Sequence, residues 1–429
     1  MKRKTILDRI LSVKNLNEAF QKVKQNNGSA GVDNMSMAEA EVYIQHHHKE
    51  FINQIRHRTY QPKPVLRVEI PKPNGGKRLL GIPTVVDRVI QQAIAQVLIP
   101  IFEETFHENS FGFRPRKNAH MAIHRGLTYL NEGYQWIVDI DLEKFFDTVN
   151  HDRLMNLVAR QIDDGDVVSL IRKYLVSGVM IAGDYAETPV GTPQGGNLSP
   201  LLSNIMLNEL DQELDKRGVR FVRYADDCVI FVKSEFAARR VMRSVTRYIE
   251  QDLGLKVNAT KSKVTKPENP EMKYLGFGFY QDYHTGDYKV KPHASAIERF
   301  KYKLKLKSKK NVSIDMTTRI RKLNQIIRGW VNYFKIGAMK KVLVKIAGHL
   351  RYRLRMCIWT QWKTGRNRGE SLIKLGMDKY NARKNGHSSK GAARIAMSWV
   401  MTTTVTNKVL AIKGLVSPDE YYLQQTHVI

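Results

Sequence analysis

The chain has 429 residues, 42% of them hydrophobic, and carries a formal net charge of +29 with a pI near 9.9. This length allows two or three domains with sizeable cores, and the charge indicates a polyanionic partner, with nucleic acid favoured over anionic lipid. Two cysteines cannot form a disulfide framework or a cysteine-rich zinc site. The sequence has no run of 18 uncharged apolar residues and no secretion signal, so we expect a cytoplasmic protein without a membrane span.

The positive charge is concentrated in the last third of the chain. Residues 1–290 contain 40 Lys and Arg against 35 Asp and Glu, whereas residues 291–429 contain 30 against 6. A nearly neutral body that keeps its acidic residues is therefore followed by a strongly basic region. This asymmetry predicts a domain boundary near residue 290.

Residues 60–83 read as two extended segments around a hairpin turn at Asn74-Gly75-Gly76. Several prolines in this region oppose a helix. Apolar residues then recur with helical spacing over residues 87–106, which predicts a helix there.

Strands and helices alternate in the next part of the chain. A strand is expected at the start of residues 136–146, followed by a helix over 151–162. A loop leads into a helix within 191–214, and residues 221–232 read as strand, turn and strand before a helix over 234–254. This alternation predicts an α+β fold with a largely antiparallel sheet plus helices.

Beyond residue 290 the pattern becomes helical. Apolar residues at offsets 0, 3, 7, 10 and 14 form one stripe, made of Ile320, Leu323, Ile327, Trp330 and Phe334. Basic residues, among them Arg328 and Lys335, lie outside this stripe, as in an amphipathic helix whose other face meets solvent or a ligand.

Two adjacent acids interrupt the apolar stretch FVRYADDCVIFV at residues 221–232. If the flanking residues pair as strands, Asp226 and Asp227 lie at the hairpin tip, where their charges repel unless a cation neutralises them. Mg²⁺ prefers oxygen ligands and often takes one or two carboxylates plus substrate phosphates. A turn with solvated aspartates is an equally good interpretation of this stretch alone.

A second acidic stretch favours the metal site. In WIVDIDLEKFFDTVN, Asp139 and Asp141 lie two residues apart on an expected strand and so share a face. Asp141 at the strand end, beside an Asp-Asp hairpin, is suited to hold two divalent ions for in-line phosphoryl transfer. Asp139 as a charge at a sheet edge and Asp147 as a helix-start residue are the simpler interpretations of those two acids.

Several stretches, in this order and spacing, resemble one family. They are GSAGVDNMS, RVEIPKPNGGKRLLGIPTVVDRVIQQAI, SFGFRPRKNAH, DIDLEKFFD, TPQGG, YADD, KYLGFGF and LNQIIRGWVNYFK. The set is similar to the group II intron-encoded reverse transcriptases/maturases, especially compact, group IIC-like forms that lack an endonuclease. The resemblance runs essentially from end to end.

The resemblance implies a right-hand polymerase with three parts. Fingers and palm would occupy residues 1–292, an α-helical thumb of the maturase type 293–365, and a small basic nucleic-acid-binding domain 366–429. It also implies that Asp141, Asp226 and Asp227 are the catalytic and metal-binding residues for two Mg²⁺ ions, with Mn²⁺ as a substitute.

The resemblance further assigns residues to the nucleotide and to the primer. Lys72 and Arg78 would grip the triphosphate, and Gln194 would line the nucleotide pocket. Phe146, five residues after Asp141, matches the steric gate that rejects a ribose hydroxyl.

Lys261 matches a lysine proposed to protonate the leaving pyrophosphate, with Lys263 as a competing candidate. Tyr274, Leu275 and Gly276 resemble the primer grip. Arg328 and Lys335 would contact the primer and template as part of the basic face of the thumb, by phosphate contacts that position rather than specify.

The function implied is RNA-directed DNA synthesis, with binding of intron RNA to assist splicing and retrohoming. Partners would be intron RNA, an RNA template with a DNA primer, target DNA and dNTPs. Two alternatives remain: an RNA-binding splicing cofactor with a vestigial polymerase site, and a reverse transcriptase of a retron or phage-defence system.

Overall fold

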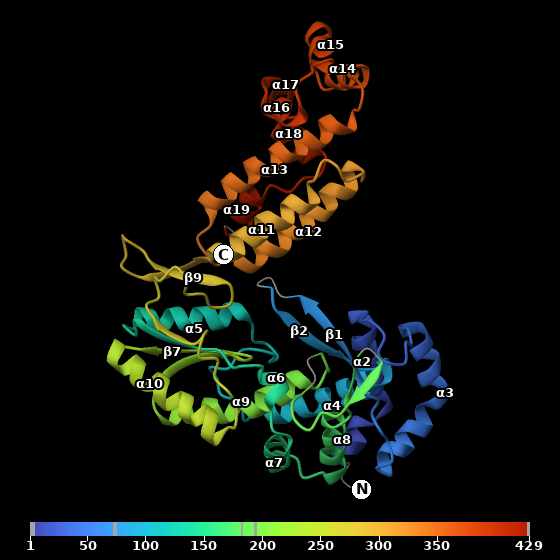
Figure 1. Ribbon diagram of the computed structural model, residues 1–429, viewed down its shortest axis with the longest axis vertical. Coiled ribbons are helices and arrows are strands. Elements are labelled where there is room, and N and C mark those ends of the chain that lie inside the picture. Colours follow the sequence, from blue (N-terminus) through green and yellow to red (C-terminus); the bar gives the residue numbers. More distant parts are fainter. Residues whose placement is uncertain (1–4, 72–74, 182, 193–194, 427–429) are drawn as a thin grey trace. The chain divides into compact units, whose positions relative to one another are not determined.

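A computed structural model of the chain describes residues 5–71, 75–181, 183–192 and 195–426. The chain forms two compact units, Met1–Lys266 and Pro267–Ile429 (Figure 1). The first contains two mixed or antiparallel sheets with helices, and the second is mostly helical, so the expected α+β class is confirmed. The expected division of the chain at residues 292 and 365 stays a prediction.

The sheet that carries the two acidic stretches has the strand order β6-β7-β3-β8, and all its neighbours are antiparallel. Its strands are β3 (Trp136–Ile140), β6 (Arg220–Tyr224), β7 (Asp227–Val232) and β8 (Lys263–Thr265). The expected strand, turn and strand over residues 221–232 is therefore confirmed.

Helices cover both faces of this sheet. They are α5 (Ala119–Asn131), α9 (Ser199–Lys216) and α10 (Glu235–Arg247), with α5 on one side and the other two opposite (Figure 1). Alternation along β7 explains this arrangement: Phe231 meets Gly126 and Tyr129 of α5, while Ile230 points into the main hydrophobic core on the other side.

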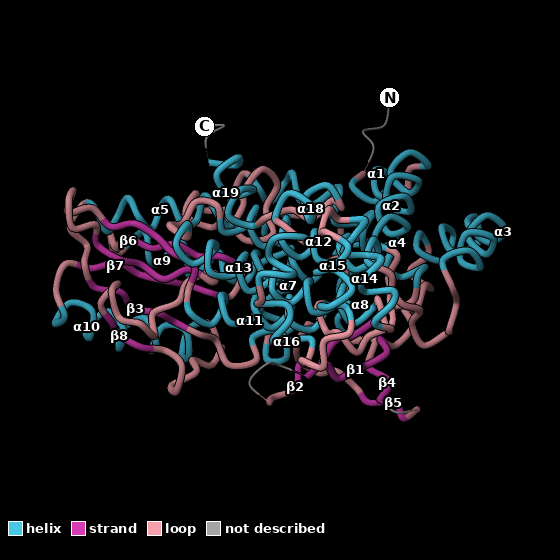
Figure 2. The backbone as a smooth tube through the Cα atoms, turned by 90° about the horizontal axis from the view of Figure 1, so that it is seen from above, coloured by secondary structure: helices cyan, strands magenta, loops and turns pink. Residues whose placement is uncertain are grey.

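The second sheet of this unit has the order β2-β1-β4-β5. Its strands are β1 (Val65–Pro71), β2 (Lys77–Ile82), β4 (Val179–Ile181) and β5 (Asp184–Ala186). β1 and β2 form the expected hairpin, whereas β1 and β4 are parallel. Figure 2 shows the strands of the two sheets as separate groups.

The remaining elements of the first unit are helical. They are α1 (Ile6–Ile10), α2 (Val13–Asn26), α3 (Met37–Arg56), α4 (Val85–Glu103), α6 (Phe145–Thr148), α7 (His151–Gln161), α8 (Gly165–Leu175) and the π-helix η1 (Tyr248–Asp252). By length and composition alone α4 would suit a membrane, but 72% of its most apolar window is buried within the structure. It is therefore a core helix.

The second unit begins with a two-stranded sheet of β9 (Phe277–Gln281) and β10 (Tyr288–Pro292). Its helices are α11 (Ala294–Lys307), α12 (Met316–Phe334), α13 (Lys340–Gln361), α14 (Gly365–Lys374), α15 (Lys379–Gly386), α16 (Ala392–Met397), α17 (Trp399–Thr404), α18 (Asn407–Ile412) and α19 (Pro418–Thr426). The predicted stripe of α12 is buried except at Trp330, which is half-buried and stacks on Phe300 with 4.4 Å between ring centroids.

Candidate active site

The two adjacent aspartates lie at the tip of the β6–β7 hairpin. Tyr224 pairs with Asp227, so the turn itself consists of Ala225 and Asp226. Ala225 adopts a φ of 57°, in the left-handed region that side chains rarely occupy. Asp227 is the exposed first residue of β7, whereas Asp226 is half-buried, so the two carboxylates have different surroundings.

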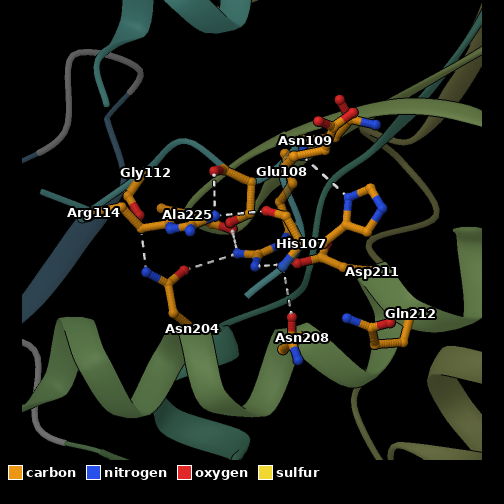
Figure 3. A network of polar contacts seen from close by, with 12 residues as sticks. His107, Glu108, Asn109, Gly112, Arg114, Asn204, Asn208, Asp211, Gln212 and Ala225 are labelled. Atoms are coloured by element: carbon orange, nitrogen blue, oxygen red, sulfur yellow. Dashed lines mark hydrogen bonds and ion pairs between the residues drawn. The ribbon is translucent and has the colours of Figure 1, made fainter. Parts of the chain in front are cut away.

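A buried guanidinium holds this turn in place (Figure 3). Arg223 is fully buried and pairs with Asp211 of α9, with 2.7 Å between Nε and Oδ1. Its Nη1 donates to the carbonyl of Ala225 at 2.9 Å and to Oδ1 of Asn204 at 3.0 Å. One side chain thereby joins α9 to the turn that carries Asp226.

The loop before α5 closes on the same turn. The amide of Phe111 donates to the carbonyl of Arg223 at 2.8 Å, and Nδ2 of Asn204 donates to the carbonyl of Gly112 at 2.9 Å. A Cβ atom at Gly112 would lie 2.2 Å from the main-chain nitrogen of Ala225. Only glycine permits this approach, since any side chain would push the turn away.

Asp141 directly follows β3, whose last residue Ile140 pairs with Cys228 of β7. The strand end therefore lies beside the start of the Asp-Asp hairpin. The amide of Asp141 donates to Oγ of Ser262 at 3.0 Å, which fixes the main chain. The ammonium group of Lys261 lies 3.2 Å from both carboxylate oxygens, so the predicted lysine is brought to one of the predicted aspartates.

Electrostatics link Asp226 to Asp141. Burial raises the pKa of Asp226, and the negative charge of Asp141 raises it further, against the opposing effects of Arg78 and Arg223. In the described part of the chain, no three His, Cys, Asp or Glu side chains form a ready-made metal site. Two repelling carboxylates do fit a divalent cation that takes its other oxygen ligands from substrate and water.

Phe146 lies next to the loop that leads to α9. The amide of Thr192 donates to the carbonyl of Phe146 at 2.6 Å, and a Cβ at Gly191 would lie 2.9 Å from the same carbonyl. The Phe146 ring is half-buried and meets the buried ring of Phe145 edge-on, with 5.1 Å between centroids. A half-buried ring at this position suits both the predicted steric gate against a ribose hydroxyl and simple packing against Phe145.

Of the residues predicted to bind the nucleotide triphosphate and line its pocket, only some lie within the described part of the chain. Lys72 and Gln194 lie outside the described residues. Arg78 lies on β2 opposite Ile70, is exposed, and is close enough to Asp226 to lower its pKa. Lys77 forms an ion pair with Glu69 across the hairpin.

The predicted primer-grip residues belong to the second unit. Leu275 and Gly276 have φ angles of 49° and 84° and form a tight turn, with Tyr274 buried beside it. Tyr333 of α12 donates through its hydroxyl to the carbonyl of Leu275 at 2.8 Å, and a Cβ at Gly276 would lie 3.2 Å from the ring of Phe334. This turn is thus attached to α12.

Of the two predicted thumb cations, Arg328 lies on α12 and Lys335 directly after it. The guanidinium of Arg328 lies 5.7 Å from the ring centroid of Tyr421, and Lys335 follows the last residue of the helix.

The sequence matches two family descriptions. Residues 70–279 match the reverse transcriptase (RNA-dependent DNA polymerase) family, and residues 297–376 match the maturase-specific domain of group II introns. The chain belongs to the group II intron reverse transcriptase/maturase family. The resemblance seen in the sequence is thereby confirmed, while the compact, group IIC-like subtype stays a prediction.

Curated relatives support the same family. Protein YkfC of Escherichia coli (strain K12) is 37% identical over 48% of this chain and 64% of its own length. Group II intron-encoded protein LtrA of Lactococcus lactis subsp. cremoris is 38% identical over 48% of this chain and 34% of its own length. The chain therefore spans less than two thirds of either relative.

Among solved structures, a chain of a partial Cas6-RT-Cas1–Cas2 complex is similar, with 23% identity and a TM-score of 0.37. The similarity covers 58% of this chain and 43% of that one.

Sequence reasoning missed the residues that hold the β6–β7 hairpin and the loop before α5. Asn204, Asn208 and Asp211 recur at offsets 0, 4 and 7 on α9, which places three polar residues on one face of a largely buried helix. Arg223 is a charged residue inside an otherwise apolar strand. A buried helix face with acidic and amide groups, together with one arginine in a buried strand, was the available signal.

Proposed function

We propose that this chain is an RNA-directed DNA polymerase encoded by a group II intron. It copies RNA into DNA from a DNA primer with dNTPs by two-metal-ion nucleotidyl transfer. It also binds intron RNA to assist splicing, and target DNA for retrohoming. Its expected location is the bacterial cytoplasm, with intron RNA or nucleoid DNA.

One observation carries the polymerase proposal. Asp141 directly follows β3 and Asp226 lies in the β6–β7 turn, close enough for the charge of Asp141 to raise the pKa of Asp226. The ammonium group of Lys261 pairs with Asp141, and the charge of Arg78 acts on Asp226. RNA binding alone gains nothing from acids that face a polyanion. A centre with both signs of charge suits a substrate that brings phosphates and metal together.

Asp141, Asp226 and Asp227 would hold Mg²⁺ or Mn²⁺. When bound, such ions lower the pKa of the attacking 3′-hydroxyl and stabilise charge on the leaving pyrophosphate. Asp227 is exposed and lies beyond the turn, so Asp141 and Asp226 would be the main ligands.

The other side chains would bind and orient the nucleotide. Arg78, with Lys72 nearby in sequence, would pair with the triphosphate by bidentate contact. Phe146 would exclude a ribose 2′-hydroxyl by steric clash, and Gln194 would line the same pocket. Lys261, whose ammonium group pairs with Asp141, would donate a proton to the leaving pyrophosphate.

The test is DNA-primer extension on an RNA template with dNTPs and Mg²⁺. Asp226→Ala should abolish extension while RNA binding is kept. Asp163→Ala changes an exposed aspartate of the same unit and should extend like the parent. Extension by Asp226→Ala at the parental rate would refute the site assignment.

The same assay separates the alternatives. A folded parent protein that binds intron RNA but never extends a primer would favour the splicing cofactor. The maturase-specific match over residues 297–376 argues against a retron or phage-defence enzyme. A group II intron in the DNA that flanks the coding sequence would support the proposal.

A further inference from the structure

A groove of about 490 Å³ lies between α11 and α13 in the second unit. Its floor is apolar and consists of the buried side chains Leu304, Ile346 and Leu350. This volume lies within the range of small-ligand sites. None of the residues assigned above to catalysis, nucleotide or primer lines it.

Basic side chains form both rims of the groove. Lys301 and Lys305 lie one turn apart on α11, and Lys345, His349 and Arg353 repeat the same spacing on α13. Four helical residues rise by about 6 Å, which is comparable to the spacing of successive phosphates along a strand. Two facing rows of donors at this spacing match a phosphodiester backbone.

The charge of the rims is poorly balanced in the free protein. Glu298 is the one acid among the lining residues, and it pairs with Lys301 at 2.8 Å. Lys305 and Lys345 make no ion pair with any residue that the structure describes. Like charges above an apolar floor repel, and an anionic ligand would relieve this repulsion.

The side chain of Arg353 forms structural hydrogen bonds within the described part of the chain, unlike the side chains of Lys305 and Lys345. Its Nε donates to Oγ of Ser308 at 2.7 Å, and its Nη2 donates to the carbonyl of Ser308 at 3.2 Å. It therefore fixes the end of α11, which leaves Lys305 and Lys345 available for a ligand.

Two rings complete the groove. The side chain of Tyr302 is 59% exposed on the α11 rim. On the α13 rim, burial lowers the pKa of His349, and the positive charges of Arg353 and Lys305 lower it further, which favours the neutral imidazole. A neutral imidazole both donates and accepts hydrogen bonds, as the edge of a base requires.

We propose that the α11–α13 groove binds one unpaired RNA nucleotide, with its base on the apolar floor against Tyr302 and its flanking phosphates on Lys305 and Lys345. An apolar floor serves a base only if that base is unpaired, because bases in a duplex are stacked inside the helix. Recognition of unpaired bases by stacking on aromatic side chains is the usual way in which proteins read RNA. The inference rests on the proposed RNA partnership of the chain.

The test compares two RNA hairpins that differ by one bulged 2-aminopurine. The full chain should bind the bulged hairpin about tenfold more tightly than the fully paired one, and the 2-aminopurine emission should change on binding. Tyr302→Ala should abolish the preference and the emission change while leaving binding of the paired hairpin unaltered. Lys305→Gln should weaken binding of the bulged hairpin about fivefold or more.

Two matched controls exclude a general loss of charge or of aromatic surface. Lys303→Gln changes an exposed lysine on the same helix that does not line the groove, and Tyr283→Ala removes a tyrosine that is 96% exposed in the same unit. Both should keep the preference, and all four variants should keep parental primer extension and melting temperature.

Three outcomes would overturn the inference. They are equal affinity for the two hairpins, a preference that survives Tyr302→Ala, and a loss in Lys303→Gln as large as in Lys305→Gln. Equal affinity of the parent protein for the two hairpins, together with normal primer extension, would refute the nucleotide-binding role of the groove and leave the proposed function intact. Absence of both RNA binding and extension in the parent would also refute the proposed function.

Discussion

Replacing Gly112 with alanine should disturb the β6–β7 turn, which carries the proposed catalytic Asp226, without changing any carboxylate. The new Cβ would lie 2.2 Å from the main-chain nitrogen of Ala225, where ordinary contacts begin at 3.4 Å. Because the atoms it meets are main chain, no rotamer change can relieve the clash. The turn or the Gly112 loop must move by about 1.2 Å, the difference between these two distances.

This displacement should be visible mainly in catalysis. Asp226 directly follows Ala225, so its carboxylate would shift relative to Asp141 by a similar amount. A misplacement of about 1 Å typically costs about a hundredfold in rate. Overpacking of this kind destabilises by about 1–3 kcal/mol, which should leave the protein folded at 25 °C.

The assay is single-nucleotide primer extension on an RNA template, with thermal unfolding measured on the same preparations. Gly165→Ala is the matched control, because a Cβ there would meet only the side chain of Arg58, at 3.5 Å. It should extend at the parental rate. Parental extension by Gly112→Ala would show that the turn tolerates the displacement and would refute the reasoning.

Three further changes test other parts of the molecule. Asp211→Ala leaves the buried guanidinium of Arg223 without its carboxylate partner. This change should lower the free energy of unfolding of the first unit by about 3–5 kcal/mol, measured by denaturant titration. Asp87→Asn places an amide donor where a buried carboxylate accepts from two tyrosines and a threonine, and should cost about 2 kcal/mol; an unchanged melting temperature would contradict this. The hydrogen bond from Lys289 lowers the pKa of Asp282 to about 2, so its stabilising effect is complete above the unfolded pKa near 3.9 and is lost as the pH falls through about 2. In Lys289→Ala the NMR titration midpoint of Asp282 should rise but stay below about 3.9, because the amides of His284 and Thr285 still donate to its carboxylate.

Local patterns in the sequence predicted most of the elements. The pairing of β1 with β2 follows from the extended segments predicted on either side of the Asn74-Gly75 pair, of which Asn74 lies outside the described residues. Helix α12 follows from its apolar spacing. Both signals act over a few residues, so no knowledge of the rest of the chain is needed. Trp330 shows the limit of such a pattern: it has helical spacing with the core residues, yet it is half-buried and stacks on Phe300 of another helix.

Of the candidate site, the sequence allows prediction of the residues whose own chemistry is informative, and not of the residues that position them. The carboxylates of Asp141 and Asp226 could be proposed because acids are unusual in apolar strands. The residues that hold these carboxylates in place could not be predicted. Ser262, which accepts from the amide of Asp141, lies 121 residues after it, and Gly112 meets Ala225 only through the packing of the loop before α5. Contacts of this kind depend on tertiary register, to which a single sequence gives no direct access.

The buried pair of Arg223 and Asp211 is best explained by the direction of the turn and not by stability. Charges lose their hydration when buried, so a pair of this kind often stabilises no better than apolar residues of similar size. An apolar side chain cannot, however, donate to the carbonyl of Ala225. The guanidinium has donors in a fixed plane, and two of them bind Asp211 while a third reaches both Ala225 and Asn204. Asp211 therefore fixes the arginine, and the arginine fixes the strained turn that carries Asp226.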